Sequence, residues 1–569
     1  MHKGFKILTT VVVLQFVAVQ FQAQAAGRIP VRAKHGMVVS ASRYATEVGL
    51  NILKKGGNAV DAAVATAFAL AVTWPSAGNI GGGGFMVYHG ADGFVTAFDF
   101  REKAPLAATE TMYLDENGEI RDRSNHRGLL AVGVPGTVAG LYLAHQRLGR
   151  LPWETVVQPA IELAQKGIRV TWGLHDGMKY LQRFAGEYPS TAKVFLKNGR
   201  KPYQPGELWK QPDLAKTLKR IKKYGRDGFY KGKTAKLIAE FMRNNGGIIT
   251  EEDLARYEAK ERQPIHGTYR GYDVYAMCPP SSGGVALVEM LNILEGFDLK
   301  AMGHNSGMYM HILTEAMRRA FADRARYLGD PDFNPDMPIE RLTSKAYARE
   351  LRQTIDLFRA SKSDPIKFND VYESTETTHL SVVDREGNAV SMTYTLEQGY
   401  GSKIVVEGAG FLLNNEMGDF NPIPGRTDTT GLIGTKPNLI APEKRMLSSM
   451  TPTIVAKDGK PVLVIGSPGG RTIINTVLQV ILNVIDHGMN VGEAVEAGRI
   501  HHQWLPDVTF IEKSATTLDS QRLLEMMGHR VRIRGGFQGR AMGIFINHDK
   551  GLLMGAADTR SPDGAAMGY

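Results

Sequence analysis

The chain alternates between segments with helical apolar spacing and short apolar runs typical of strands. Residues 45–55 and 59–72 repeat apolar side chains every three or four positions, which predicts two helices. The second carries almost no charge, so we expect it to lie buried between layers. The same spacing predicts further helices over 285–294, 308–328 and 473–485, and a mainly helical region over 151–262.

Runs rich in β-branched residues predict the strands. The clearest is a hairpin, in which residues 376–384 and 389–396 flank the turn Arg385-Glu386-Gly387-Asn388. Thr377 and Thr378 stand at the head of its first strand. Alone, this pair is explained by the strand propensity of threonine; a nucleophile that becomes a chain terminus is the alternative. Further strands are expected over 93–100, 452–456 and 462–465, with a strand pair over 264–277.

Composition places the chain among ordinary globular proteins. It has 569 residues, with 43% hydrophobic and 22% charged side chains, and this length suggests two to four domains. The net charge of +10 permits acidic partners. The densest basic run, 216–233, has Leu214, Leu218 and Ile221 at helical spacing, which indicates the solvated face of an amphipathic helix. Because no nucleic-acid-binding motif accompanies it, we expect no nucleic-acid partner.

The first residues are typical of an export signal. Lys3 and Lys6 precede the apolar run 7–21, and Ala23-Gln24-Ala25 follows as a small-x-small cleavage pattern. We predict a signal peptide over 1–25 and an exported protein, periplasmic or secreted. The run is shorter than the roughly 20 apolar residues of a spanning helix, and no later segment reaches that length, so we expect no membrane span. The single cysteine, Cys278, allows no intramolecular disulfide.

Two glycine clusters and one arginine suggest chemistry. The cluster 78–85 has a helix before it and a strand after it, the reverse of a dinucleotide fingerprint, so close backbone packing is the better interpretation. Gly469-Gly470 at the start of a helix can offer N–H groups to an anion, either a phosphate or an oxyanion; the lysine of a phosphate loop is missing. Arg101 follows a predicted strand and could serve equally in a structural ion pair or as a carboxylate hook.

Six motifs together resemble the γ-glutamyltranspeptidase family of N-terminal-nucleophile hydrolases. Each motif is weak alone, but their order and spacing match that family along essentially the whole chain after the predicted signal peptide. The motifs are Phe100-Arg101-Glu102, Pro279-Pro280-Ser281-Ser282-Gly283-Gly284, Thr377-Thr378-His379 with Ser381-Val382-Val383-Asp384, Asn414-Asn415-Glu416-Met417 with Asp419-Phe420, Ser448-Ser449-Met450, and Gly466-Ser467-Pro468-Gly469-Gly470.

The resemblance implies an α+β fold, a four-layer αββα sandwich of the N-terminal-nucleophile hydrolase type. It also implies one precursor that cuts itself between Glu376 and Thr377. Residues 26–376 would form the large subunit and 377–569 the small subunit of an intertwined heterodimer. No metal or organic cofactor is expected. The α-amine freed on Thr377, with a reference pKa of about 8, can act as its own general base.

The resemblance further implies the roles of the site residues. Thr377 is the expected nucleophile, Thr395 its hydrogen-bonding partner, and His379 is expected to be structural. The substrate's amino-acid end needs one carboxylate site and one ammonium site. The expected oxyanion donors are Gly469 and Gly470, the carboxylate-binding residues Arg101, Ser448 and Ser449, and the ammonium-binding residues Glu416 and Asp419, with Glu397 as a third acidic group where some members carry an amide.

The implied activity is γ-glutamyl transfer. Glutathione and other γ-glutamyl compounds would be the donors, and water or an amino-acid or dipeptide amine the acceptor. Thr430, in the loop 421–445, stands where a lid tyrosine is common in the family. Two alternatives are a glutaryl or cephalosporin acylase and a non-catalytic binding paralogue. Retained Glu416 and Asp419 argue against the first, since a glutaryl group has no ammonium; retained Thr377 and Thr395 argue against the second.

Overall fold

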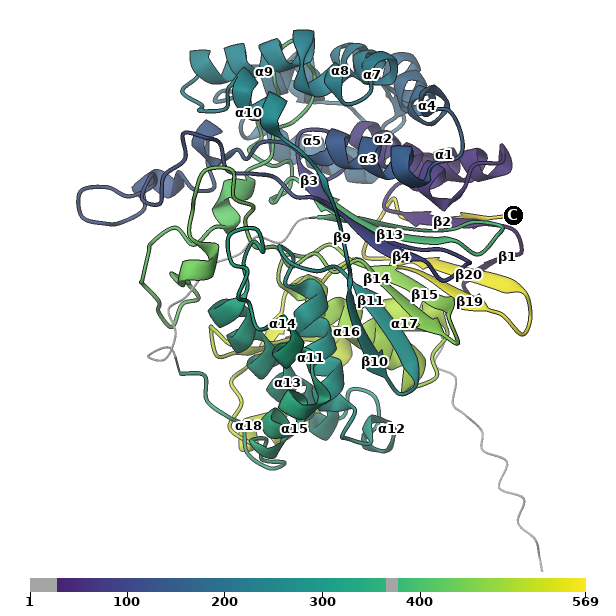
Figure 1. Cartoon of the computed structure of the whole chain (residues 1–569), viewed down its shortest axis with the longest axis vertical. Helices are drawn as coiled ribbons and strands as arrows, with labels where there is room; N and C mark the ends of the chain where they lie inside the picture. Colours follow the sequence, from purple (N-terminus) through teal and green to yellow (C-terminus); the bar gives the residue numbers. More distant parts are fainter. Residues whose placement is uncertain (1–27, 365–376) are drawn as a thin grey trace, which may run out of the picture.

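Two seven-stranded sheets stack face to face, and helices cover both outer faces (Figure 1). The structure is a computed structural model that describes residues 28–364 and 377–569. Four layers in the order αββα form an α+β fold, as the resemblance implies. The predicted signal peptide and Glu376 lie outside the described residues. Within the described ranges, no helix combines the length and the apolar character needed to cross a membrane.

The first sheet carries the threonine hairpin at its centre. Strands β12 and β13 pair antiparallel, with Thr378 opposite Tyr394, and β2 and β3 flank them. The hairpin prediction is therefore confirmed to within one or two residues at each end. The strand order is β21 (Ala565–Gly568), β2 (Met37–Ser40), β12 (Thr378–Val383), β13 (Ala389–Thr395), β3 (Gly83–His89), β4 (Val95–Phe100) and β9 (Lys260–Arg262).

The second sheet packs against the hairpin through its middle strands, since β12 and β13 contact β15 and β19. Its strand order is β1 (Val31–Ala33), β20 (Leu552–Ala557), β19 (Met542–Asn547), β15 (Lys460–Gly466), β14 (Thr453–Lys457), β11 (Tyr272–Ala276) and β10 (Ile265–Tyr269). Smaller sheets join β16 (Ile500–His501), β17 (Thr509–Glu512) and β18 (Val531–Arg534), β5 (Ile168–Arg169) with β8 (Leu208–Trp209), and β6 (Leu196–Lys197) with β7 (Lys201–Pro202).

Helices α1, α2 and α3 cover the first sheet, with α4 and α7 outside them, and α11, α16 and α17 cover the second (Figure 1). Every residue of α2 is buried, which confirms its predicted place between layers. The bounds are α1 (Arg43–Lys54), α2 (Ala59–Thr73), α3 (Thr137–Leu148), α4 (Trp153–Lys166), α5 (Trp172–Gln182), α6 (Pro189–Phe195), α7 (Pro212–Tyr224), α8 (Asp227–Tyr230), α9 (Gly232–Asn244), α10 (Glu251–Arg256), α11 (Gly283–Leu294), α12 (Leu299–Met302), α13 (Gly307–Tyr327), α14 (Ile339–Leu342), α15 (Lys345–Gln353), α16 (Thr472–Ile485), α17 (Val491–Glu496) and α18 (Leu518–Met526).

One helix prediction needs correction. The basic run 216–233 crosses three helices, α7, α8 and the start of α9, because Gly225 at φ 57° ends α7 and Gly232 at φ 63° opens α9. Its apolar positions Leu214, Leu218 and Ile221 are nevertheless buried, as an amphipathic helix requires.

The first glycine cluster confirms close backbone packing. A Cβ on Gly82 would lie 2.0 Å from the carbonyl oxygen of Thr395, and one on Gly83 would lie 2.4 Å from that of Phe100. Both contacts are far below any real Cβ distance. Glycine therefore lets the loop before β3 pass directly beside the end of β13, where Thr395 stands.

Candidate active site

A small cavity opens at the end of the hairpin. It brings together every predicted site residue except Gly469, from segments as far apart in the sequence as those of Arg101 and Gly470. Concave sites with a few convergent polar groups are the usual form of a ligand pocket. The lining residues are Arg101, Thr377, Thr395, Glu397, Glu416, Asp419, Ser448, Ser449, Met450, Gly470 and Ile473.

The two threonines meet at one edge of this cavity. The hydroxyl oxygens of Thr377, just before β12, and Thr395, the last residue of β13, lie 3.4 Å apart. The backbone N–H of Glu397 donates to Thr395 Oγ1 over 2.9 Å, and Asn79 Nδ2 donates to its carbonyl over 2.8 Å. Alternation along β12 turns Thr378 to the opposite face of the sheet. The cavity therefore contains the first threonine of the pair and not the second.

His379 is held away from acid–base chemistry. Its ring lies between the hydroxyls of Thr393 at 2.8 Å and Ser381 at 3.0 Å, in the space between the sheets. Burial lowers the pKa of His379 to about 3, so the ring stays neutral at physiological pH. A Cβ on Gly466 would meet this ring at 2.3 Å, which explains why β15 ends in glycine.

The second glycine cluster joins β15 to α16. Gly469 (φ 133°) and Gly470 (φ 56°) occupy backbone conformations that favour glycine. Gly470 lines the cavity, whereas Gly469 stands beside it, where a Cβ would meet Thr472 Oγ1 at 2.5 Å. Gly470, which precedes α16, therefore lines the same cavity as Thr377.

Arg101 forms a buried ion cluster. Its guanidinium donates to Glu416 and to Asp419, lies 3.7 Å from Glu102, and donates through Nε to the carbonyl of Met446 over 3.2 Å. Burial alone would lower the pKa of Arg101, but the three carboxylates outweigh it and raise the pKa. Of the two roles left open by the sequence, the ion pair is present, and the same guanidinium also lines the cavity.

The cluster contains more carboxyl groups than cationic groups. Burial raises the pKa of Glu102 to about 8, although Arg101 opposes the shift. Burial likewise raises the pKa of Glu416 well above its usual range. At neutral pH, part of the cluster therefore carries protons. An added ammonium group would stabilise the ionised form of these carboxyls.

The serine pair accepts hydrogen bonds from two N–H donors. The backbone N–H of Met450 donates to Ser448 Oγ over 3.1 Å, and Arg324 Nη2 donates to Ser449 Oγ over 3.0 Å. A hydroxyl group can accept one hydrogen bond and donate another. Both serines line the cavity next to Arg101.

The family assignment follows from comparison with known proteins. A protein-family model for gamma-glutamyltranspeptidase matches residues 45–568. The chain belongs to the γ-glutamyltranspeptidase family.

The relatives include hydrolases and acylases. The chain is 50% identical to a glutathione hydrolase proenzyme of Escherichia coli, covering 95% of this chain and 93% of the relative. It is 40% identical to an acylase proenzyme (Acylase ACY 1) of a Pseudomonas species, covering 94% and 93%. Among solved structures, a cephalosporin acylase from Bacillus halodurans matches with a TM-score of 0.84 at 29% identity, covering 97% and 98%. The fold is therefore shared across both activities.

Two residues that contact predicted site residues were not predicted from the sequence. Arg324, inside α13, holds Ser449 and also donates to Ser282 Oγ over 2.9 Å. His126 Nδ1 lies 3.2 Å from Glu397 Oε1. Burial would lower the pKa of His126, but Glu397 outweighs it and raises the pKa. Neither residue stands in a motif, so only its contact in the structure reveals it. Met450 and Ile473 also line the cavity; Met450 belongs to the Ser448-Ser449-Met450 motif, and Ile473 follows Gly470 by three positions.

Thr430 does not line the cavity. It is exposed in the loop 421–445, where Asp428 Oδ1 accepts its backbone N–H over 2.8 Å. The loop is anchored near the site instead by Asn438, whose Nδ2 donates to the carbonyl of Asp419 over 2.7 Å. At the position where a lid tyrosine is common in the family, this chain therefore has Thr430 in a local turn.

Proposed function

We propose that this chain is a γ-glutamyltransferase and glutathione hydrolase whose nucleophile is Thr377. The observation that carries the proposal is the single cavity that contains the Thr377 hydroxyl, an oriented serine pair and an acidic pair. The family membership and the similarity to glutathione hydrolase proenzymes support it. A substrate with an amide at one end and a free amino acid at the other fits these groups.

The chemistry begins with self-cleavage between Glu376 and Thr377, which yields fragments 26–376 and 377–569. The freed α-amine takes the proton of the Thr377 hydroxyl as its oxygen attacks the γ-amide carbon. Gly469 and Gly470 would donate N–H groups to the developing oxyanion, each worth about 10²–10³ in rate. The amine then returns the proton to the leaving nitrogen. Water or an acceptor amine cleaves the γ-glutamyl ester and restores the threonine.

Recognition would use both ends of the charge cluster. Ser448, Ser449 and Arg101 would bind the α-carboxylate through two hydroxyls and a guanidinium. Glu416 and Asp419 would bind the α-ammonium, with Glu397 as a further negative group. Removing either substrate charge leaves buried partners unpaired, which is the costly case for binding.

An acylase activity is the alternative, because acylases share the fold. A glutaryl group lacks the ammonium, so Glu416 and Asp419 would face no cation. Turnover of a γ-glutamyl anilide should exceed that of the matched glutaryl anilide at equal concentration. A preference for the glutaryl compound would reject γ-glutamyl transfer and favour the acylase.

Processing and export are tested on the protein made from its full-length gene. We expect two bands on a denaturing gel, and mass spectrometry should place one new terminus at Thr377 and another near residue 26, in a periplasmic or secreted fraction. The acceptors are expected to be water, amino acids and dipeptides. A persistent single chain without turnover would favour the non-catalytic alternative.

A further inference from the structure

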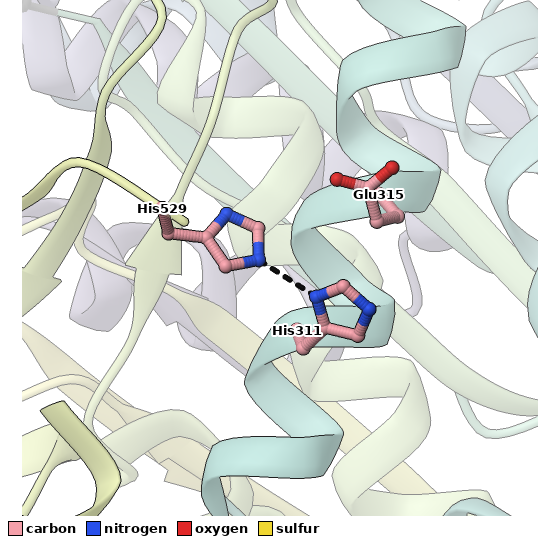
Figure 2. A group of neighbouring side chains, drawn as sticks. All are labelled: His311, Glu315 and His529. Atoms are coloured by element: carbon pink, nitrogen blue, oxygen red, sulfur yellow. Dashed lines mark hydrogen bonds between the residues drawn. The ribbon is translucent and has the colours of Figure 1, made fainter. Parts of the chain in front are cut away.

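A polar cluster on α13 lies outside the cavity and takes no part in the proposed chemistry. His311 and Glu315 stand one turn apart on the same helix face, and His529 approaches them from the part of the chain after Thr377 (Figure 2). All three side chains are buried. Polar groups buried to this degree require partners.

The cluster is a hydrogen-bonded set and not an open set of metal ligands. His311 Nδ1 and His529 Nε2 are 2.7 Å apart and bonded to each other (Figure 2). Two ligands of one zinc ion, with bonds of about 2 Å in tetrahedral geometry, would lie roughly 3.3 Å apart. Glu315 Oε2 already accepts from Arg319 Nη1 over 2.7 Å. The residue types are those of a metal site, but the atoms that would bind the metal are hydrogen-bonded to other groups of the protein.

The cluster holds residues 354–364, the described segment that follows α15. His311 Nε2 donates to the carbonyl of Asp356 over 2.8 Å. This bond leaves Nδ1 as the acceptor, so His529 donates to His311 and a hydrogen-bond chain reaches the segment. Glu315 Oε1 accepts the backbone N–H of Ser361 over 3.1 Å.

The next turn of α13 extends these contacts. Arg318 Nη1 donates to Ser363 Oγ over 2.5 Å and also pairs with Asp507. Asp507 Oδ2 in turn accepts the backbone N–H of Ser363 over 2.9 Å. Arg319 Nη2 donates to the carbonyl of Thr354 over 2.9 Å.

Apolar burial does not explain the order of this segment. Ile355 packs against the core at the start of the segment, but beyond it the large apolar side chains are exposed, Leu357 to 43% and Phe358 to 74%. The contacts that hold it are polar, and several involve charged groups, which form the stronger hydrogen bonds. They come from both sides of the proposed cut, because α13 precedes it and Asp507 and His529 follow it.

We infer that this cluster is a clamp that positions the chain for self-cleavage, with Glu315, Arg318 and Asp507 as positioning residues. The inference rests on the proposed function. It places the last clamped residue, Ser363, fourteen positions before Thr377, and β12 fixes the chain on the other side of the bond. Both ends of the connection that contains the bond are thereby held.

The contacts nearest to the cut are those of Ser363. Arg318 and Asp507 bind its side chain and its backbone N–H. Without them, the last clamped residue is Ser361, held by Glu315. The variants that test the clamp therefore remove contacts of Ser363.

The test follows the full-length precursor, collected early from cold-grown cells, on denaturing gels over time. We expect Asp507→Asn and Ser363→Ala to slow the appearance of the two fragments at least about twofold, the smallest effect expected for one lost hydrogen bond. The exposed control Asp549→Asn should match the wild type. Turnover per processed active site should be unchanged in all three, which separates positioning from damage to the active site. Ser363→Ala removes one partially buried hydroxyl, so it tests the clamp even if Asp507→Asn folds poorly.

Trypsin provides an independent readout of the clamp, since Arg359 and Lys362 are exposed within the segment. Cleavage there, followed by mass spectrometry, should be faster in Asp507→Asn than in the wild type. Faster trypsin cleavage with an unchanged rate of self-cleavage would overturn the positioning role. Unchanged trypsin cleavage would overturn the clamp itself. A wild-type precursor that never cleaves would instead reject the proposed function.

Discussion

Arg324 Nη2 donates to Ser449 Oγ over 3.0 Å, and the two residues lie on opposite sides of the proposed cut. The same guanidinium donates through Nε to Ser282, whose backbone N–H and hydroxyl both donate to the carbonyl of Ser448. One residue of the proposed large subunit therefore supports both serines of the small one. We therefore expect Arg324 to position the two serines proposed to bind the carboxylate of the substrate.

Replacing Arg324 with glutamine should weaken binding more than chemistry. A hydrogen bond from a charged donor contributes about 1.5–3 kcal/mol, so we expect KM for a γ-glutamyl anilide to rise roughly 10- to 100-fold, with kcat nearly unchanged. Steady-state kinetics measures this split. Arg326→Gln, at an exposed position on the same helix, is the matched control. A fall in kcat at constant KM would contradict the assigned role.

The hydroxyl of Thr377 is expected to be essential, and that of Thr378 dispensable. Thr377→Ala should remain one chain without turnover, whereas Thr377→Ser keeps a hydroxyl and should still cleave. Thr378→Val preserves volume on the opposite face of β12 and should process as the wild type does. Gels and anilide turnover report both steps. Two fragments from Thr377→Ala would show that another residue cuts the chain.

Substrate binding should release protons from the acidic cluster. Burial raises the pKa of Glu102 to about 8, so at pH 7 this carboxyl is largely protonated in the empty site. An ammonium group favours its ionised form, so the proton leaves on binding and affinity increases as pH rises toward 8. Calorimetry with L-glutamate in two buffers of different ionisation enthalpy measures the release. We expect Glu102→Gln to reduce it, and no proton exchange in the wild type would contradict this prediction.

The sequence predicts individual elements well and their partners poorly. Their apolar runs locate α2, β12 and β13 to within a few residues, because all three elements are buried along their whole length. The hydrophobic pattern does not show which elements pack against one another, so the four-layer arrangement was predicted only from the resemblance. Arg101 shows the same limit, since its partner Glu416 is 315 positions away and the ion pair could not be chosen over a carboxylate hook. The Arg324–Ser449 contact, 125 positions apart, had no sequence signal at all.

Gly82 should not tolerate any side chain, because its backbone packs directly against Thr395. In Gly82→Ala, the added Cβ would lie 2.0 Å from the Thr395 carbonyl oxygen, so the end of β13 must move. That movement would shift Thr395 away from Thr377 and strain the Asn79 contacts that hold both segments.

We expect Gly82→Ala to lose about 1–3 kcal/mol of stability through overpacking, and to cut itself much more slowly. Gly186→Ala is the control, because a Cβ there meets nothing within 4 Å. Thermal unfolding of the precursor and the gel time course check the two effects separately. Normal cleavage in a destabilised Gly82→Ala protein would mean that the position of Thr395 is not what limits processing. Normal stability would mean that the loop before β3 can yield without cost.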